Sequence, residues 1–511
     1  MDLKHKNIKV CEWAKKIKTE CEALADIIVP DTQPDIYRVL CVNATCNLDE
    51  RYIRKDKIIF SGTVKFTVLY TGENQRDTIY TIEHTAPFNH QAEMPQAPED
   101  ALCISRCVVS STGFTVKNSR KIAACAFLLL DTNATKHKEI NALEALQGDG
   151  IVPHKFTEIN SDSSICSKEV EFVLSDTISV PMAEDSRILD FNVRIDEAEI
   201  KTVNNKAILK GILPAKILYS SGGQISGFET EFAFTEIIDL EMASVDSALS
   251  SFFNVSDISY SLSNTNGETM LDTDIKIKGG IRAFEKLSCP LVSDIYSPDY
   301  NYSVKRNIVK LESFFTLGET QLTLKESLSL PQDEGSISRV HYMSVYPSCK
   351  KLSFENSSLK IFGNASTCII YSDSEGSLNS IKKDIPFETE LPCGADYNAS
   401  DFDVCVSAMN YSYVLSSSND VQTRTVLKIS ADQIMLSPVS VVSDFTEDKS
   451  SPIDKSNQPS IIVCYPQDGS TLWDYALKYS TTSEEIALVN GIEPESSLCP
   501  GKPLIIPKRH I

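Results

Sequence analysis

The sequence lacks a long hydrophobic run. Its most apolar stretch, AACAFLLL at 123–130, is far shorter than the roughly 20 residues that a membrane-spanning helix needs. The first residues, MDLKHKNIKVCEWAKKIK, carry positive charges with no apolar segment behind them, which is unlike a secretory signal. We therefore expect a soluble cytoplasmic chain with no membrane insertion.

Positive charge is also scarce. The chain of 511 residues has 49 Lys and Arg against 70 Asp and Glu, which gives a formal net charge of −21. Nucleic-acid binding depends on cationic side chains that displace counterions from the phosphates, and anionic membranes attract proteins through the same charges. The composition thus excludes a nucleic-acid partner and favours uncharged ligands or basic surfaces of other proteins.

Paired cysteine motifs are absent although the chain has fifteen cysteines. Cys41 and Cys46, and Cys103 and Cys107, are close in sequence, but there is no CxxC pair and no histidine at the spacing of a zinc finger. In a reducing cytosol such residues act as small buried hydrophobes. We predict no metal site and no cofactor.

Most of the chain alternates apolar and polar residues with the period of two that is typical of β-strands, as in IIFSGTVKFTVLYTG at 58–72. This stretch belongs to a repeat. In each copy a glycine is followed eight residues later by a tyrosine and then by a polar turn, and a phenylalanine comes 15 to 18 residues after the tyrosine. The anchors are Gly62, Tyr70 and Phe88; Gly211, Tyr219 and Phe234; and Gly363, Tyr371 and Phe387.

The spacing between copies, 149 and then 152 residues, is too long for a solenoid and indicates whole domains in tandem. A glycine inside a strand marks a bulge or a close backbone approach, and a tyrosine at a strand end buries its ring while its hydroxyl reaches the turn. We interpret both anchors as architectural. The prediction is a mainly β chain of three β-sandwich or barrel-like domains with one short helix each: residues 1–160, 161–315 and 316–445.

The sequence contains no recognisable motif of catalytic residues. The seven histidines do not recur at equivalent repeat positions, and no nucleophile elbow, P-loop or HExxH motif occurs. Asp31 and Asp35, in VPDTQPDIYRVL, could serve as an acid and base pair, or could build a turn. The other copies, VPMAEDSRIL and LPQDEGSISRV, do not keep the carboxylate spacing, which favours the turn. We predict a protein that is not an enzyme.

The alternating pattern ends at a polar segment, TEDKSSPIDKSNQP at 446–459, which we predict to be a flexible linker because Ile453 is its only apolar residue. Residues 460–508 then predict a small domain of the order β-α-α-β that is tethered rather than packed in. Ser470 or Thr471 caps the first helix, Thr482 or Ser483 caps the second, and Asn490-Gly491 ends it.

This segment resembles a LysM domain. The resemblance rests on Gly469, Thr471, Leu472, Trp473, Ala476, Lys478, Tyr479, Thr482, Ile486, Asn490, Ile492, Gly501, Leu504, Ile506 and Pro507, while Ser470 replaces the usual aspartate. LysM domains commonly bind N-acetylglucosamine polymers such as peptidoglycan. By position, the resemblance implies a groove formed by Gly469, Ser470, Thr471, Leu472, Asn490, Gly491 and Ile492.

Trp473 is expected to be half exposed, because it lies about 100° around the helix from Leu472. It could pack on the adjoining strand or contact a partner, with Tyr465, Tyr475 and Lys478 as its expected neighbours.

The first repeat, with IIVPDTQPDIYRVLCVNA, FSGTVKFTVLY and APFNHQAEMP, resembles the SPOCS domain of endospore-forming bacteria, and the other two look like diverged copies. Tandem SPOCS domains followed by a LysM domain are similar to spore coat morphogenetic proteins. The resemblance implies a mother-cell cytoplasmic protein at the forespore surface that helps the coat encase the spore, with the LysM domain binding the SpoIVA-type coat-basement ATPase. Two hypotheses remain: an assembly adaptor that binds protein, and a module that binds peptidoglycan.

Overall fold

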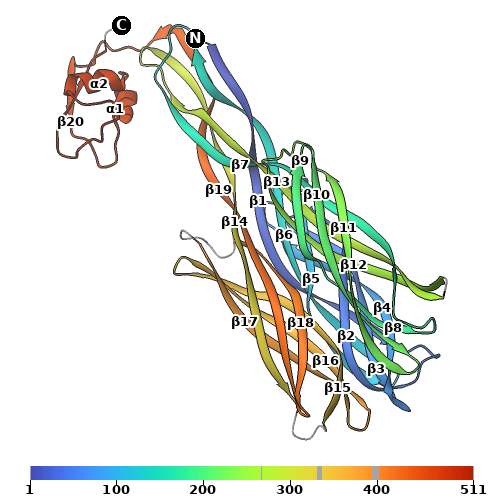
Figure 1. The fold of residues 1–511 in the computed structure, drawn as a ribbon. Helices are drawn as coiled ribbons and strands as arrows, with labels where there is room; N and C mark the ends of the chain where they lie inside the picture. The colour runs from blue at the N-terminus through green and yellow to red at the C-terminus, as the bar shows by residue number, and fades with distance from the viewer. Residues whose placement is uncertain (1, 266, 331–335, 394–401, 510–511) are drawn as a thin grey trace.

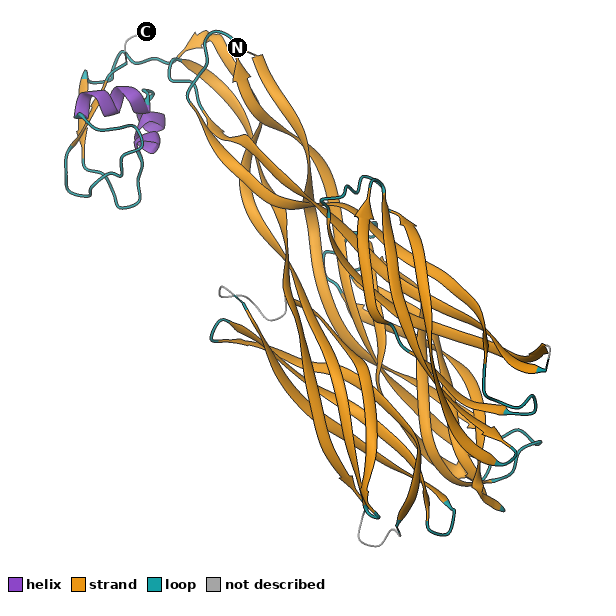
Figure 2. Ribbon diagram, viewed as in Figure 1, coloured by secondary structure: helices purple, strands orange, loops and turns teal. Residues whose placement is uncertain are grey.

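The computed structural model describes residues 2–265, 267–330, 336–393 and 402–509. As predicted, the chain is mainly β, and in the described residues helix occurs only near the C-terminus (Figure 2). Within the same residues, no helix has the length and apolarity needed to cross a membrane.

The first repeat contains six strands. They are β1 (Asp2–Ile28), β2 (Ile36–Arg54), β3 (Lys57–Gly72), β4 (Gln75–Glu93), β5 (Leu102–Asn118) and β6 (Lys121–Gln147).

The second repeat follows the same order, with its second strand split in two by a break near 194–195. Its strands are β7 (His154–Ser179), β8 (Arg187–Val193), β9 (Asp196–Val203), β10 (Lys206–Ser221), β11 (Gln224–Asp239), β12 (Ala248–Thr265) and β13 (Glu268–Ile295).

The third repeat again has six strands, and the small terminal domain follows it. The strands are β14 (Tyr300–Ser329), β15 (Ile337–Glu355), β16 (Ser358–Asp373), β17 (Leu378–Pro392), β18 (Phe402–Ser417) and β19 (Asp420–Pro452). The terminal domain consists of β20 (Ile461–Cys464), α1 (Leu472–Tyr479), α2 (Ser483–Asn490) and β21 (Leu504–Pro507).

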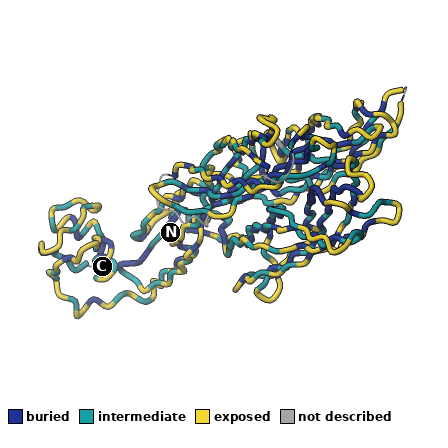
Figure 3. Tube along the Cα trace, turned by 90° about the horizontal axis from the view of Figure 1, so that it is seen from below, coloured by how far each residue is buried: buried dark blue, intermediate teal, exposed yellow. Residues whose placement is uncertain are grey.

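Each repeat is a sandwich of two antiparallel sheets. In the first repeat β2, β3 and β4 form one sheet, and β5, β6 and β1 form the other; the second and third repeats pair their strands in the same way. Apolar side chains from all six strands of the first repeat share one buried cluster, and the other repeats have equivalent clusters. Figure 3 shows these buried positions running through the repeats.

The first and last strands of each repeat extend beyond its sandwich and come together as a stalk (Figure 1). Apolar residues of β1 and β6, of β7 and β13, and of β14 and β19 share buried clusters along this stalk. One pair of residues, Cys11 and Lys310, links β1 to β14 and so joins the sheets of the first and third repeats. The N-terminus and the terminal domain lie at the far end of the stalk (Figure 1).

The three repeats also meet within the body. The residues directly before the anchor tyrosines, Leu69, Leu218 and Ile370, lie in one buried cluster with side chains from all three repeats. A second meeting point is ionic: Asp403 of the third repeat pairs with Lys16 of the first and with Arg282 of the second, at 3.2 Å from Arg282 Nη2. Burial alone would raise the pKa of Asp403, but the two cations outweigh burial and hold it at about 2.

The repeat anchors have clear geometric roles. In each repeat the glycine lies directly opposite the phenylalanine on the neighbouring strand. A Cβ atom on Gly62 would stand 2.3 Å from the Asn47 carbonyl oxygen and 2.7 Å from the Phe88 ring, so no other residue fits there without a shift. The Tyr70 hydroxyl donates to the Pro34 carbonyl at 3.1 Å, within the loop between β1 and β2. Tyr219 makes the equivalent bond to Pro181 at 3.3 Å.

Asp31 and Asp35, the two carboxylates of the loop between β1 and β2, stabilise the conformation of that loop. Asp35 accepts hydrogen bonds from Ser119 at 2.8 Å and from Arg120 Nη1 at 2.5 Å, and the same arginine reaches Asp31 at 3.4 Å. The bonds to Ser119 and Arg120 lower the pKa of Asp35. The corresponding loop of the third repeat, at 331–335, lies outside the described residues.

Several expectations need correction. The predicted boundaries at 160/161 and 315/316 fall inside β7 and β14, and the strand order instead favours repeat edges at 148–153 and 296–299. The segment 446–459 is not a free linker, because β19 continues to Pro452 and pairs with β14. The neighbouring strand orders the backbone up to Pro452, and farther along the segment Lys455 is buried and pairs with Asp299 at 3.4 Å. The short helix expected in each repeat does not occur among the described residues.

Candidate functional site

The terminal domain is built on two capped helices. The Thr471 side chain caps α1 and Thr482 caps α2, each in a capping box closed by the residue three positions later, Asp474 and Glu485. Gly491, at φ 66°, ends α2 in the left-handed region that favours glycine. Strands β20 and β21 pair antiparallel and complete the β-α-α-β order that the sequence predicts.

The predicted groove residues differ in their exposure to solvent. Gly469, Thr471 and Gly491 are exposed, and Ser470 and Ile492 are half-buried. Leu472, in contrast, is buried in the core of the domain, and Ile492 packs against the same core. The Ser470 hydroxyl, where the family usually has a carboxylate, donates to the Gln467 carbonyl at 2.7 Å.

Asn490 holds the domain together. Its amide nitrogen donates to the carbonyls of Ile486 at 2.8 Å and Ile505 at 2.5 Å, and its oxygen accepts from the Ile505 N–H at 2.8 Å. These bonds tie the end of α2 to β21. Because both ends of the amide are engaged, the side chain has little capacity left for a ligand.

Trp473 is not half exposed as expected: it is 9% exposed and faces the stalk. Its ring packs edge-on against Tyr296 at a centroid distance of 4.8 Å, and its Nε1–H donates to Asp294 Oδ2 at 2.8 Å. The ammonium of Lys155 lies 4.9 Å from the ring centroid. Of the expected neighbours, Tyr475 packs against the same buried cluster as Trp473, while the exposed Lys478 lies over the Tyr479 ring.

Further contacts fasten the domain to the stalk tip. The Tyr296 hydroxyl donates to the Thr481 carbonyl at 2.8 Å, and burial raises the pKa of this tyrosine. Arg509 bridges Asp299 of the stalk, at 3.0 Å, and Glu485 of α2, at 3.2 Å. The expectation of a tethered, unpacked domain is therefore wrong: the domain shares a buried cluster with the stalk.

With the terminal domain docked on the stalk, the end of α2 stays exposed to solvent. Leu488 is 83% exposed and Val489 is 47% exposed, and both directly precede the groove residues at the end of α2. We call Leu488 and Val489 the α2 apolar end. Large exposed apolar side chains next to each other mark interaction surfaces more often than isolated ones do.

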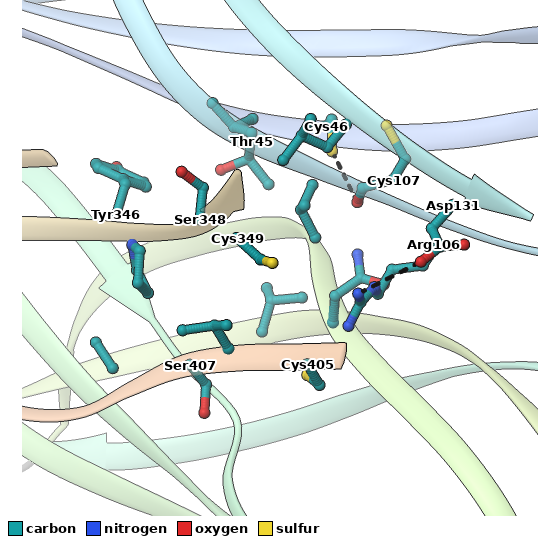
Figure 4. Close-up of a pocket in the computed structure, with 18 of the residues that line it drawn as sticks. Thr45, Cys46, Arg106, Cys107, Asp131, Tyr346, Ser348, Cys349, Cys405 and Ser407 are labelled. Carbon is teal, nitrogen blue, oxygen red and sulfur yellow. Dashed lines mark hydrogen bonds and ion pairs between the residues drawn. The ribbon is translucent and has the colours of Figure 1, made fainter. Parts of the chain in front are cut away.

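A cavity of about 820 Å³ lies where the three repeats meet (Figure 4). Arg106 of the first repeat donates to the Val404 carbonyl of the third at 2.7 Å, across its wall. Three buried polar atoms at this cavity have no hydrogen-bond partner among the described residues: Asp131 Oδ1, Arg194 Nη1 and Ser348 Oγ.

The lining of the cavity carries titratable groups, among them the Lys16 amine and the carboxyls of Asp131 and Asp190. Among the described residues that line it there is no histidine. The neighbouring Cys46 thiol, together with burial, raises the pKa of Cys107, and burial raises the pKa of Cys349. Thiols with raised pKa values are poor nucleophiles near neutral pH.

The residues that the sequence failed to indicate are those of the stalk. Lys155 lies near the start of β7, Asp294 lies near the end of β13, and Tyr296 and Asp299 lie in the connection from β13 to β14; no motif marks any of them. The sequence indicates them only indirectly: residues 290–302, PLVSDIYSPDYNY, join the second and third repeats but lack the polar composition of a linker.

Comparison with protein families agrees with this organisation. The model described as "SipL, SPOCS domain" matches residues 35–117 and 186–263, in the first and second repeats. The model described as "LysM domain" matches residues 467–507. Both are families of non-catalytic binding domains. No curated protein and no solved structure matches the chain.

Proposed function

The chain is a SipL-like, sporulation-related protein that carries a LysM domain, and from this premise we propose that it is a non-enzymatic adaptor in spore coat assembly. It acts in the mother-cell cytoplasm at the forespore surface. Its LysM domain binds the spore coat morphogenetic ATPase (SpoIVA-type), and the three β repeats with their stalk hold that domain away from the body.

The observation that carries this proposal is the surface that the docked LysM domain leaves free. The α2 apolar end, Leu488 and Val489, directly precedes the groove residues Gly491 and Ile492 in sequence and stays exposed in the docked domain. Burial of apolar surface is the dominant favourable contribution to the free energy of most protein–protein associations. This surface thus suits a protein partner.

The polar side chains of the groove support the same preference. Thr471 is occupied by the α1 capping box, and Asn490 by its three bonds within the domain. Ser470 offers a hydroxyl where the LysM family usually offers a carboxylate. A glycan, which is recognised through many hydrogen bonds, would find few free side-chain partners here.

A direct binding assay tests the proposal. The purified full-length chain is titrated into the purified SpoIVA-type ATPase by calorimetry. We expect measurable binding that Leu488→Asp weakens at least tenfold, because a charge would be buried at the interface. Ile308→Asp is the matched control, since Ile308 is 80% exposed but lies on β14 of the stalk. No association of the unaltered chain, or equal effects of both variants, would refute the proposal.

Peptidoglycan binding is the second candidate, because the LysM match itself favours it. The groove backbone at Gly469 and Gly491 is exposed and offers N–H and C=O groups to a sugar. Strong retention of the full-length chain on insoluble peptidoglycan, without affinity for the ATPase, is the result that distinguishes this function from the first.

A further inference from the structure

Three potential metal ligands meet on neighbouring strands of the stalk. Cys11 of β1 lies directly opposite His137 of β6, and β14, which carries Glu312, pairs with the other edge of β1. The Cys11 Sγ, a ring nitrogen of His137 and a carboxylate oxygen of Glu312 all lie within 4.8 Å of one another. Within the described part of the chain, no other His, Cys, Asp and Glu side chains form such a group.

The spacing suits a small coordination sphere. His137 Nε2 is 3.0 Å from Glu312 Oε2, with a hydrogen between them. Zinc binds sulfur at ~2.3 Å and nitrogen or oxygen at ~2.0–2.1 Å, so tetrahedral ligand atoms lie about 3.3–3.7 Å apart. The three donors reach that spacing through side-chain rotations that move their atoms by about an ångström or less.

All three side chains of the group are largely buried. The Glu312 side chain is 4% exposed and the His137 side chain 15%, and Cys11 is buried as well. Besides His137, the carboxylate accepts one N–H bond, from Ser164 of β7 at 3.3 Å. A buried carboxylate is unfavourable unless positive charge compensates it, and a cation bound beside Glu312 would supply such charge.

We propose that Cys11, His137 and Glu312 form a binding site for Zn²⁺ at the junction of the three repeats. Thiolate, imidazole and carboxylate are the ligand set that zinc accepts, whereas calcium and magnesium require oxygen donors throughout. On binding, the thiol releases its proton to solvent, and His137 ligates through Nε2 as the neutral Nδ1–H tautomer, so the hydrogen between Nε2 and Glu312 moves through solvent to Nδ1. Thiolate and carboxylate together then balance the two charges of the ion, and a fourth position is left for a non-protein ligand.

The site would strengthen the junction between the first and third repeats, where β1 meets β14. The pairing of β1 with β14 consists of a single residue pair, Cys11 with Lys310, while each repeat is held internally by long ladders. A metal that bridges β1, β6 and β14 would tie two ligands of the first repeat to one of the third across this seam. Ser164 brings the second repeat to the same carboxylate, so the ion would stiffen the base of the stalk on which the LysM domain sits.

Cobalt substitution tests the site directly. Co²⁺ is titrated into the metal-free full-length chain, and the spectrum is recorded for the thiolate-to-cobalt charge-transfer band and for the visible bands of tetrahedral cobalt. We expect one cobalt per chain, displaced by stoichiometric Zn²⁺. Cys11→Ser should abolish the charge-transfer band, and Glu312→Gln should weaken cobalt affinity at least tenfold.

Two cysteine variants serve as matched controls. Cys289→Ser changes another buried cysteine of the stalk, on β13, and Cys499→Ser changes an exposed thiol that could bind cobalt adventitiously. Both should keep the full signal. The proposal is overturned if the unaltered chain gives no charge-transfer band, or if the band persists in Cys11→Ser and disappears in Cys499→Ser.

A stability measurement provides a readout that does not depend on the spectrum. Zn²⁺ should raise the Tm of the full-length chain with a dependence on free metal concentration, because a ligand that binds only the folded state stabilises it by mass action. Cys11→Ser should fold and lose this metal dependence. An equal rise of Tm in the unaltered chain and in a folded Cys11→Ser variant contradicts the site.

Discussion

Tyr296 is the stalk residue on which docking of the LysM domain depends most. It is 1% exposed, packs edge-on against Trp473, and donates its hydroxyl hydrogen to the Thr481 carbonyl. Tyr296→Ala removes both contacts without changing any residue of the LysM domain. We therefore expect the domain to remain folded and to leave the stalk for part of the time.

The size of the effect follows from these two contacts. An edge-on aromatic pair contributes about 0.5–1.5 kcal/mol beyond burial, and a hydrogen bond between uncharged groups contributes about 0.5–1.5 kcal/mol. Their loss, about 1–3 kcal/mol, lowers the ratio of docked to undocked domain roughly 5- to 150-fold. The pairs of Trp473 with Asp294 and of Arg509 with Asp299 remain in the variant.

Tryptophan fluorescence measures docking. The chain has two tryptophans, so Trp13→Phe leaves Trp473 as the single reporter. In this background Tyr296→Ala should shift the emission to longer wavelength and increase quenching by acrylamide, and solution scattering should show a larger maximum dimension. Tyr52→Ala is the control, because Tyr52 is 45% exposed and lies on β2 in the body. Identical emission and quenching in the two variants would refute the docking contact.

Three further changes test the fold. Gly62→Ala should destabilise the first repeat by about 1–3 kcal/mol through overpacking, whereas Gly227→Ala, with no atom within 4 Å of the added Cβ, should be near neutral in urea unfolding. Asp403→Asn leaves its two cations unpaired, and should cost about 3–5 kcal/mol in urea unfolding near neutral pH. The pKa of Asp403 is depressed in the folded state, so the stability it contributes is complete above the unfolded value, about 4, and is lost as the pH falls to about 2; acid titration of unfolding should show a steeper loss of stability in the unaltered chain than in the variant. Asn490→Ala should lower the Tm of the LysM domain and increase amide exchange at Ile505, whose N–H loses its acceptor.

The repeats and the terminal domain can be predicted from the sequence because the residue patterns that indicate them are local. The period-two alternation predicts the strands, and the glycine and phenylalanine anchors are cross-strand neighbours in all three copies. The two helices follow from capping residues only a few positions apart, at Thr471 and Thr482. Each of these features is decided by contacts within one hairpin or one helical turn.

The contacts between repeats are not local, and the sequence does not reveal them. Trp473 meets Asp294 across 179 residues, and His137 meets Glu312 across 175, so neither pair has a spacing that a motif could express. The error at 446–452 has another cause: polar composition indicates that side chains are not buried, but it does not indicate whether a neighbouring strand pairs with the backbone.

The location of the chain in a sporulating cell tests the central claim most directly, namely that the exposed end of the LysM domain recruits the protein to the coat. A fluorescent fusion of the full-length chain should form a shell around the forespore. The Leu488→Asp fusion should be diffuse in the mother cell, and the Ile308→Asp fusion should keep the shell. An unaltered fusion that stays diffuse, or that gathers at the cell wall, would contradict the account.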